Sequence, residues 1–214
     1  MVVRLSQSNA YNREYNMKTY LESSTYIDWI TPEVETLAHS LTSNGASKEE
    51  IARICFEWVR DNIRHSADYK LNPVTCKASD VLKHKTGYCY AKSHLLAALL
   101  RANGIPAGLC YQRLSIDDKG SPYSLHGLNA VYLENHGWYR IDARGNKEGI
   151  NAQFTPPHEQ LAFAINLKRE ADLPEIWPAP LPGVVSVLEK SKTYQDVYEN
   201  LPDIEIIQIS RHNK

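Results

Sequence analysis

The residues with the clearest potential for chemistry lie where a glycine turn meets an apolar helix. Within Lys85–Gly104, Cys89 follows the turn, and the residues after it are apolar around most of a predicted helix. Such a helix belongs in a core, and Asn103 before a glycine and Pro106 is a typical helix end. Amide N–H groups in a first turn have no intrahelical acceptor, and the helix dipole favours a thiolate there. Cys89 is therefore predicted to be reactive.

A nucleophilic thiol needs a base, and the base needs a third group that orients it. After the helix the apolar period changes from 3.6 to 2. This pattern predicts three strands, over 107–116, 125–133 and 138–142. His126 lies near the start of the second strand, and Asp142 ends the third. We therefore predict that Cys89, His126 and Asp142 form a triad.

The predicted hairpin between the last two strands constrains this triad. A tight turn through residues 134–137 would place Asp142 opposite residue 129, three residues from His126. At about 3.3 Å per residue, that offset is about 10 Å. The triad therefore requires a turn nearer Glu134 or a bulge, for example at Gly127.

Two blocks, GYCYAKSHLLAALLRANGIPAG and LHGLNAVYLENHGWYRIDARG, resemble the transglutaminase-like superfamily of cysteine enzymes. That family has Gly-x-Cys at the start of a helix that closes in Gly-Ile-Pro-Ala. A histidine then begins a strand, and Trp-x-x-x-Asp ends the next strand. Cys89, His126 and Asp142 fall on the three catalytic positions of this pattern. The resemblance covers roughly residues 50–150 and departs from the family at Gly127, where alanine is common.

The order of elements and the resemblance together favour an α+β, papain-like fold. N-terminal helices and a central helix that carries the nucleophile would pack on an antiparallel β-sheet. The resemblance also implies acyl transfer without a cofactor. The thiolate attacks a peptide or protein amide, forms a thioester, and passes the acyl group to water or an amine. The Cys89 amide is an expected oxyanion donor. Further expected oxyanion or substrate contacts are Tyr69, Asn72, Tyr88 and Arg144.

Two other functions stay open at this point. One is a catalytically silent domain that binds peptides or proteins in the same cleft. The other is an acyltransferase similar to arylamine N-acetyltransferases, although the sequence has no evident acyl-CoA motif. An intact Cys, His and Asp set favours an enzyme over a binding domain. Hydrolysis is expected ahead of transfer, because microbial members of the group are often described as cysteine proteases.

Composition argues against several classes of partner. The formal net charge of −1 gives no general attraction to nucleic acid or to an anionic membrane. No run approaches the ~20 apolar residues of a membrane span, and the first residues lack the apolar run of a signal peptide. Four cysteines without a C-x-x-C pair favour a cytoplasmic protein with reduced thiols. The Cys and His residues lack ligand-like clustering, so no metal is expected.

We divide the chain into a polar arm (1–26), a catalytic core (27–155) and an extension that wraps the same domain (156–214). Cys55, Cys110 and His94 are expected to be packed rather than catalytic. The further predicted elements are helices beginning after Thr31 and Ser47, a short helix over 158–167, an extended proline-rich stretch over 172–183, a helix over 184–201 and an edge strand over 204–209.

Overall fold

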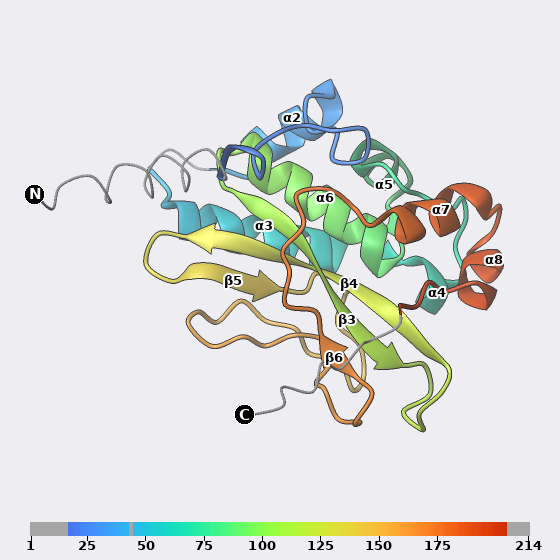
Figure 1. Ribbon diagram of the computed structural model, residues 1–214. Helices are drawn as coiled ribbons and strands as arrows, with labels where there is room; N and C mark the ends of the chain where they lie inside the picture. The colour runs from blue at the N-terminus through green and yellow to red at the C-terminus, as the bar shows by residue number, and fades with distance from the viewer. Residues whose placement is uncertain (1–16, 43–44, 205–214) are drawn as a thin grey trace, which may run out of the picture.

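The computed structural model describes residues 17–42 and 45–204 of the chain (Figure 1). The helices are α2 (Pro32–Ser40), α3 (Lys48–Asn62), α4 (Ser66–Tyr69), α5 (Ala78–His84), α6 (Cys89–Ala102), α7 (Pro182–Lys190) and α8 (Tyr194–Glu199). The strands are β1 (Arg64–His65), β2 (Thr86–Gly87), β3 (Ala107–Ser115), β4 (Tyr123–Leu133), β5 (Gly137–Ile141) and β6 (Ala171–Asp172). This order confirms the predicted α+β fold, with helices before an antiparallel sheet.

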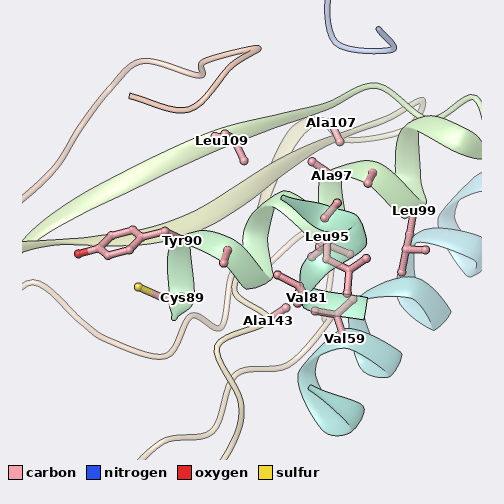
Figure 2. Packing of buried hydrophobic residues seen from close by; sticks show 14 of the residues in the cluster. Val59, Val81, Cys89, Tyr90, Leu95, Ala97, Leu99, Ala107, Leu109 and Ala143 are labelled. Carbon is pink, nitrogen blue, oxygen red and sulfur yellow. The ribbon is translucent and has the colours of Figure 1, made fainter. Parts of the chain in front are cut away.

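Helix α6 is the centre of the core. Residues 89–101 are all buried, which confirms the helix that the sequence predicts. The helix packs on β3 and β4 on one side and on α2, α3 and α5 on the other (Figure 1). Figure 2 shows Leu95 on the side of Val59 and Val81, and Ala97 on the side of Ala107. Burying each leucine contributes about 1.5–3 kcal/mol, so α6 is held strongly in place.

The main sheet has the strand order β5-β4-β3-β6. Strands β3 and β4 pair along their whole length, residues 107–115 with 123–131, without a bulge. Strand β5 is shorter and pairs only with residues 129–133 of β4. The first part of β4, residues 123–128, therefore has no partner in β5. The short strands β1 and β2 pair in parallel just before α6 begins.

The predicted N-terminal arm lies on the domain where it is described, over residues 17–26. The Tyr20 hydroxyl donates a hydrogen bond of 2.8 Å to the carbonyl oxygen of Ile176. Ile176 belongs to the proline-rich stretch predicted over 172–183, which contains no helix as far as Leu181, whereas Pro182 and Gly183 begin α7. Trp177, the residue after Ile176, exchanges two backbone hydrogen bonds with Leu109 of β3, at 2.8 and 2.9 Å. The first sixteen residues of the arm lie outside the described ranges.

Two of the C-terminal predictions are wrong. No helix forms over 158–167, because the Gln153 amide bonds to the carbonyl of Gln160 in a strand-like bridge. The predicted last helix is two helices, α7 and α8, because Thr193 and Asp196 form a capping box that starts α8. The predicted edge strand lies outside the described residues, apart from its first residue. Each helix in the described ranges is too short or too polar to span a lipid bilayer.

A buried lysine joins α6 to the end of α3. Lys92 lies one turn after Cys89 and has no exposed surface. Its Nζ donates hydrogen bonds to the carbonyl oxygen of Ile63 and, at 3.4 Å, to that of Arg60. Carbonyls at a helix C-terminus lack intrahelical donors, and Lys92 supplies them. Burial and the nearby Arg144 lower the pKa of Lys92 to about 7.

We expect Lys92→Met to destabilise the fold by about 1–3 kcal/mol, since it leaves a buried carbonyl without its donor. Between pH 7 and 10.5 the unfolded lysine holds a proton that the folded one has lost. Raising the pH through this window therefore increases the stability of the wild type relative to the variant, and the difference between them should grow. Urea unfolding at pH 7 and 9 measures it, with Lys190→Met on the exposed end of α7 as the control. An equal effect of both variants would contradict the role of Lys92.

Candidate active site

Cys89 is the first residue of α6, as predicted, and lines a cavity of about 640 Å³. Only 7% of the residue is exposed. Figure 2 shows its sulfur at the start of the helix, directed away from the apolar cluster. Its backbone amide has no intrahelical acceptor and lies at the positive end of the helix dipole. Both features favour negative charge on the sulfur and on an oxygen bound beside it.

The His126 imidazole is held by a buried carboxylate. Its Nε2 lies 2.7 Å from Oδ2 of Asp142, a residue that is 1% exposed. The carboxylate is fixed in turn by two backbone amides, those of Arg144 and Ala162, each at 3.1 Å. Cys89 and His126 line the same cavity, and the charge of the Cys89 side chain contributes to the pKa of the ring. The structure thus brings the three predicted residues together.

The turn between β4 and β5 lies nearer Glu134, as the triad requires, and the offset of about 10 Å that a turn through residues 134–137 would give does not arise. The closing pair of the hairpin is Leu133 with Gly137, so only three residues form the turn. Continuing this register places Asp142 opposite Leu128, two residues from His126 rather than three. An even offset puts both side chains on the same face as diagonal neighbours, which are within reach of each other. Strand β4 needs no bulge for this contact.

The early end of β5 also frees a donor for the sulfur. Leu125 and Gly127 precede the first β4 residue that pairs with β5, Asn129. The Leu125 amide instead donates to the carbonyl of Pro202, at 2.7 Å. The Gly127 amide donates to Sγ of Cys89, at 3.4 Å. A hydrogen bond to sulfur stabilises a thiolate more than a thiol.

The side chains next to His126 raise the proton affinity of its ring. Burial alone lowers the pKa of His126, but the Asp142 carboxylate and then the Cys89 sulfur outweigh it and raise the pKa to about 10. Burial raises the pKa of Asp142, whereas the His126 ring and the two amides lower it more. An imidazolium at His126 beside an ionised Asp142 is the charge state that these shifts favour.

Gly127 is required by the close approach of α6 to β4. A Cβ atom at Gly127 would lie 2.9 Å from Cδ1 of Tyr90 and 3.1 Å from its Cα. The Tyr90 ring packs beneath the site, and its hydroxyl donates to the carbonyl of Leu125. The chain therefore has glycine at position 127, where alanine is common in the family, because the bulk and position of Tyr90 leave no room for a Cβ atom.

Two predicted oxyanion contacts, Tyr69 and Asn72, do not line the cavity. Tyr69 is 59% exposed, and its ring lies against the guanidinium of Arg64 on the outer surface. The Oδ1 atom of Asn72 accepts a hydrogen bond of 2.7 Å from the amide of Tyr194. Spacing along the chain cannot show this, because α4 turns the segment away from Cys89.

The other two predicted contacts, Tyr88 and Arg144, do line the cavity, but their polar groups are already bound. The Tyr88 hydroxyl donates to the carbonyl of Tyr194 at 2.6 Å. The Arg144 guanidinium forms two hydrogen bonds with Asp68, at 2.7 and 3.0 Å. These contacts make Tyr88 an anchor for α8 and make Arg144 part of an ion pair.

Sequence reasoning missed the charged wall of the cavity. Asp68 binds Lys147, at 2.7 Å, as well as Arg144, and these cations lower its pKa to about 2 against the effect of burial. His65 lies beside them, with Nδ1 3.7 Å from Asp68 and without a hydrogen-bond partner among the described residues. Burial and the Arg144 charge lower the pKa of His65, so its ring is neutral. The pairing of β1 with β2, two residues each, brings His65 here.

The other cysteines have inert surroundings, as predicted for Cys55 and Cys110. Burial raises the pKa of Cys55, Cys76 and Cys110 to about 12. His94 is fully buried and bonds through Nδ1 to the Cys76 carbonyl at 2.7 Å. Burial lowers its pKa to about 4. In the described part of the chain, no group of three His, Cys, Asp or Glu side chains is placed to hold a metal.

A sequence model of the transglutaminase-like superfamily matches residues 35–143, slightly more than half of the chain. The matched range contains Cys89, His126 and Asp142. Among proteins of curated function, none is significantly similar to this chain in sequence.

Two solved structures are similar to this chain over part of its length. A candidate cysteine protease from Cytophaga hutchinsonii is 21% identical over 60% of this chain and 42% of its own length, with a TM-score of 0.49. The periplasmic domain of TgpA from Pseudomonas aeruginosa is 18% identical over 61% of this chain and 47% of its own, with a TM-score of 0.46. The chain thus matches less than half the length of either protein.

We expect the His126 ring to titrate near pH 10 and the variant Asp142→Asn to lower that pKa, because the carboxylate is the main group that raises it. NMR of the ring Cε1–H group between pH 5 and 11 measures this, with the resonance assigned by its loss in His126→Gln. Since burial would then dominate, the variant should titrate at or below an ordinary histidine value. A wild-type His126 ring that titrates near pH 6.5 would contradict the effect of the Asp142 carboxylate on its pKa.

We expect Gly127→Ala to displace Tyr90 and the start of α6, because the new Cβ meets backbone as well as ring. Overpacking of this kind costs about 1–3 kcal/mol, and a small displacement of the thiol should slow its alkylation about tenfold or more. Gly183→Ala is the matched control, since a Cβ there has nothing within 4 Å. Iodoacetamide labelling rates of Cys89 in both variants test this, and equal rates would refute it.

Proposed function

This chain belongs to the transglutaminase-like superfamily, and on that premise we propose that it is a cysteine-dependent amide hydrolase or acyl transferase. Cys89 is the nucleophile, His126 the general acid and base, and Asp142 the group that orients His126. The observation that carries this proposal is the His126 ring, which the buried Asp142 carboxylate holds in the cavity that Cys89 also lines. The Gly127 amide on the sulfur supports it further.

The first half of the reaction forms a thioester. The Cys89 thiolate attacks the amide carbonyl, and a bond forms between Sγ and the carbonyl carbon. The developing oxyanion accepts a hydrogen bond from the Cys89 backbone amide, which the helix start leaves free. His126 gives its proton to the amine as the carbon–nitrogen bond breaks, and the amine leaves.

The second half releases the acyl group. The charge of the thiolate is lost in the thioester, which removes one of the groups that raise the pKa of His126. The neutral ring then accepts a proton from water or from an incoming amine, which attacks the thioester carbonyl. The bond to sulfur breaks, the thiolate returns, and the product is an acid or a new amide. We propose hydrolysis as the main outcome.

The proposed substrate is a peptide or protein amide. A cavity of about 640 Å³ is large enough for several residues of an extended chain around the reacting bond. A cytoplasmic location stays a prediction, and the four free thiols are compatible with a reducing compartment.

The proposal predicts a thioester on Cys89. Incubation with a library of peptide amides, followed by acid quenching and intact mass measurement, should trap an acyl adduct that maps to Cys89. Cys89→Ala should abolish the adduct and reduce turnover by about a thousandfold or more, whereas Cys55→Ala, at another buried thiol, should keep it. Adding a primary amine then tests the acceptor: unchanged release of acid supports hydrolysis, and a new amide product supports transfer.

The main alternative, a silent binding domain, predicts a different result. In that case Cys89 reacts with iodoacetamide no faster than Cys55, Cys76 and Cys110, and His126→Gln changes none of these rates. For an enzyme, we expect selective labelling of Cys89 that His126→Gln slows, because the ion pair no longer forms.

A further inference from the structure

One wall of the catalytic cavity is made by residues beyond the family match, which ends at residue 143. The cavity is also lined by Phe163, Tyr198 and Leu201. Tyr198 belongs to α8, which packs against α4, and Leu201 lies in the segment that follows. Figure 1 shows α8 (red) at the end of the fold that holds α4.

Hydrogen bonds from the residues before Cys89 and His126 hold this wall in place. On one side, the hydroxyl of Tyr88, which precedes Cys89, bonds to the Tyr194 carbonyl of α8 at 2.6 Å. On the other, the amide of Leu125, which precedes His126, bonds to the Pro202 carbonyl at 2.7 Å. A bidentate ion pair between Arg113 and Asp203, with both contacts at 2.7 Å, holds the end of the segment on β3. The wall is therefore a defined part of the site.

The surface that this wall presents is apolar. Leu125 and Leu201 line it, with Leu114 and Ile116 farther along β3 and its turn. The Glu170 carboxylate nearby is occupied by the amides of Ser115, Asn166 and Leu167. Tyr198 is 52% exposed and Ile116 38%, so two large side chains meet water at the mouth of the cavity. Asp118 and Ser124 supply polar groups at the rim.

We propose that Tyr198, Leu201 and Leu125 form a subsite for an aliphatic or aromatic side chain of the substrate, close to the reacting amide. This inference rests on the proposed function and names a substrate class for it. The occupant covers the half-exposed Tyr198 ring and removes apolar surface from water, which stabilises the complex. The Asp68–Arg144–Lys147 wall cannot take this role, because its groups are charged. Tyr198 and Leu201 come from the extension, so residues outside the matched core contribute to specificity, and the matched core supplies the chemistry.

A pair of thiol reagents tests the subsite without a known substrate. Iodoacetamide and N-phenethyl-iodoacetamide carry the same reacting group, but only the second has an aromatic side chain. We measure the second-order rate constant of each at Cys89 by peptide mass mapping and divide the two. The same ratio for a free cysteine peptide gives the intrinsic value. An apolar pocket discriminates by about tenfold or more, so the wild-type ratio should exceed the peptide ratio by that factor.

Matched variants locate the effect. Tyr198→Ala should return the ratio toward that of the peptide, and Leu201→Ala should lower it as well. Tyr69→Ala removes an aromatic side chain of similar exposure that does not line the cavity, and it should leave the ratio unchanged. Circular dichroism of each variant confirms that the fold persists.

The outcomes separate this inference from the proposed function. A wild-type ratio equal to that of the peptide overturns the subsite, while fast and selective iodoacetamide labelling of Cys89 would still support the enzyme. A fall in the ratio for Tyr69→Ala as large as that for Tyr198→Ala also overturns the subsite. Cys89 labelling no faster than that of the three other cysteines overturns the proposed function and the subsite together.

Discussion

The arrangement of the site depends on where β5 ends. Because β5 stops at Ile141, the edge groups in the first part of β4 have no partners in β5 and lie beside the start of α6. The Gly127 amide can then reach Sγ of Cys89, and Asp142 can leave the strand and cross to His126. A longer β5 would pair with Gly127 and take its amide away from the sulfur. The contacts of the nucleophile, the base and the carboxylate thus all depend on where β5 ends.

This geometry requires α6 to stay fixed on β4, and three buried polar side chains hold it there. Asn129 of β4 donates to the carbonyls of Ser93 and Gly108, at 2.9 and 3.3 Å. Lys92 joins the first turn to the end of α3. Arg101 joins the last turn to the Ala107 carbonyl, at 2.8 and 3.0 Å. Hydrophobic packing places the helix in the core, and these directed bonds set its position along the strand.

Structural features that depend on long sequence patterns were predicted well, and features that depend on single turns were not. The apolar run of α6 and the alternation of β3 and β4 fix the core, so Cys89 and His126 could be placed. The offset of Asp142 depends on one residue of turn length, which Gly137 settles with a positive φ of 71°. The position of His65 depends on two-residue strands, too short to leave a pattern. Tyr69 and Asn72 were misplaced for the same reason.

The distribution of charge explains why a basic residue beside the site does not disturb it. Arg144 follows Asp142 closely, and an unpaired guanidinium there would lower the pKa of His126 and oppose the ion pair. Its charge is instead taken by Asp68, and its backbone amide still helps to hold the Asp142 carboxylate. Arg144 and Lys147 share the Asp68 carboxylate, and burial leaves His65 neutral beside them. The field at the sulfur is therefore set by His126, the Gly127 amide and the helix start.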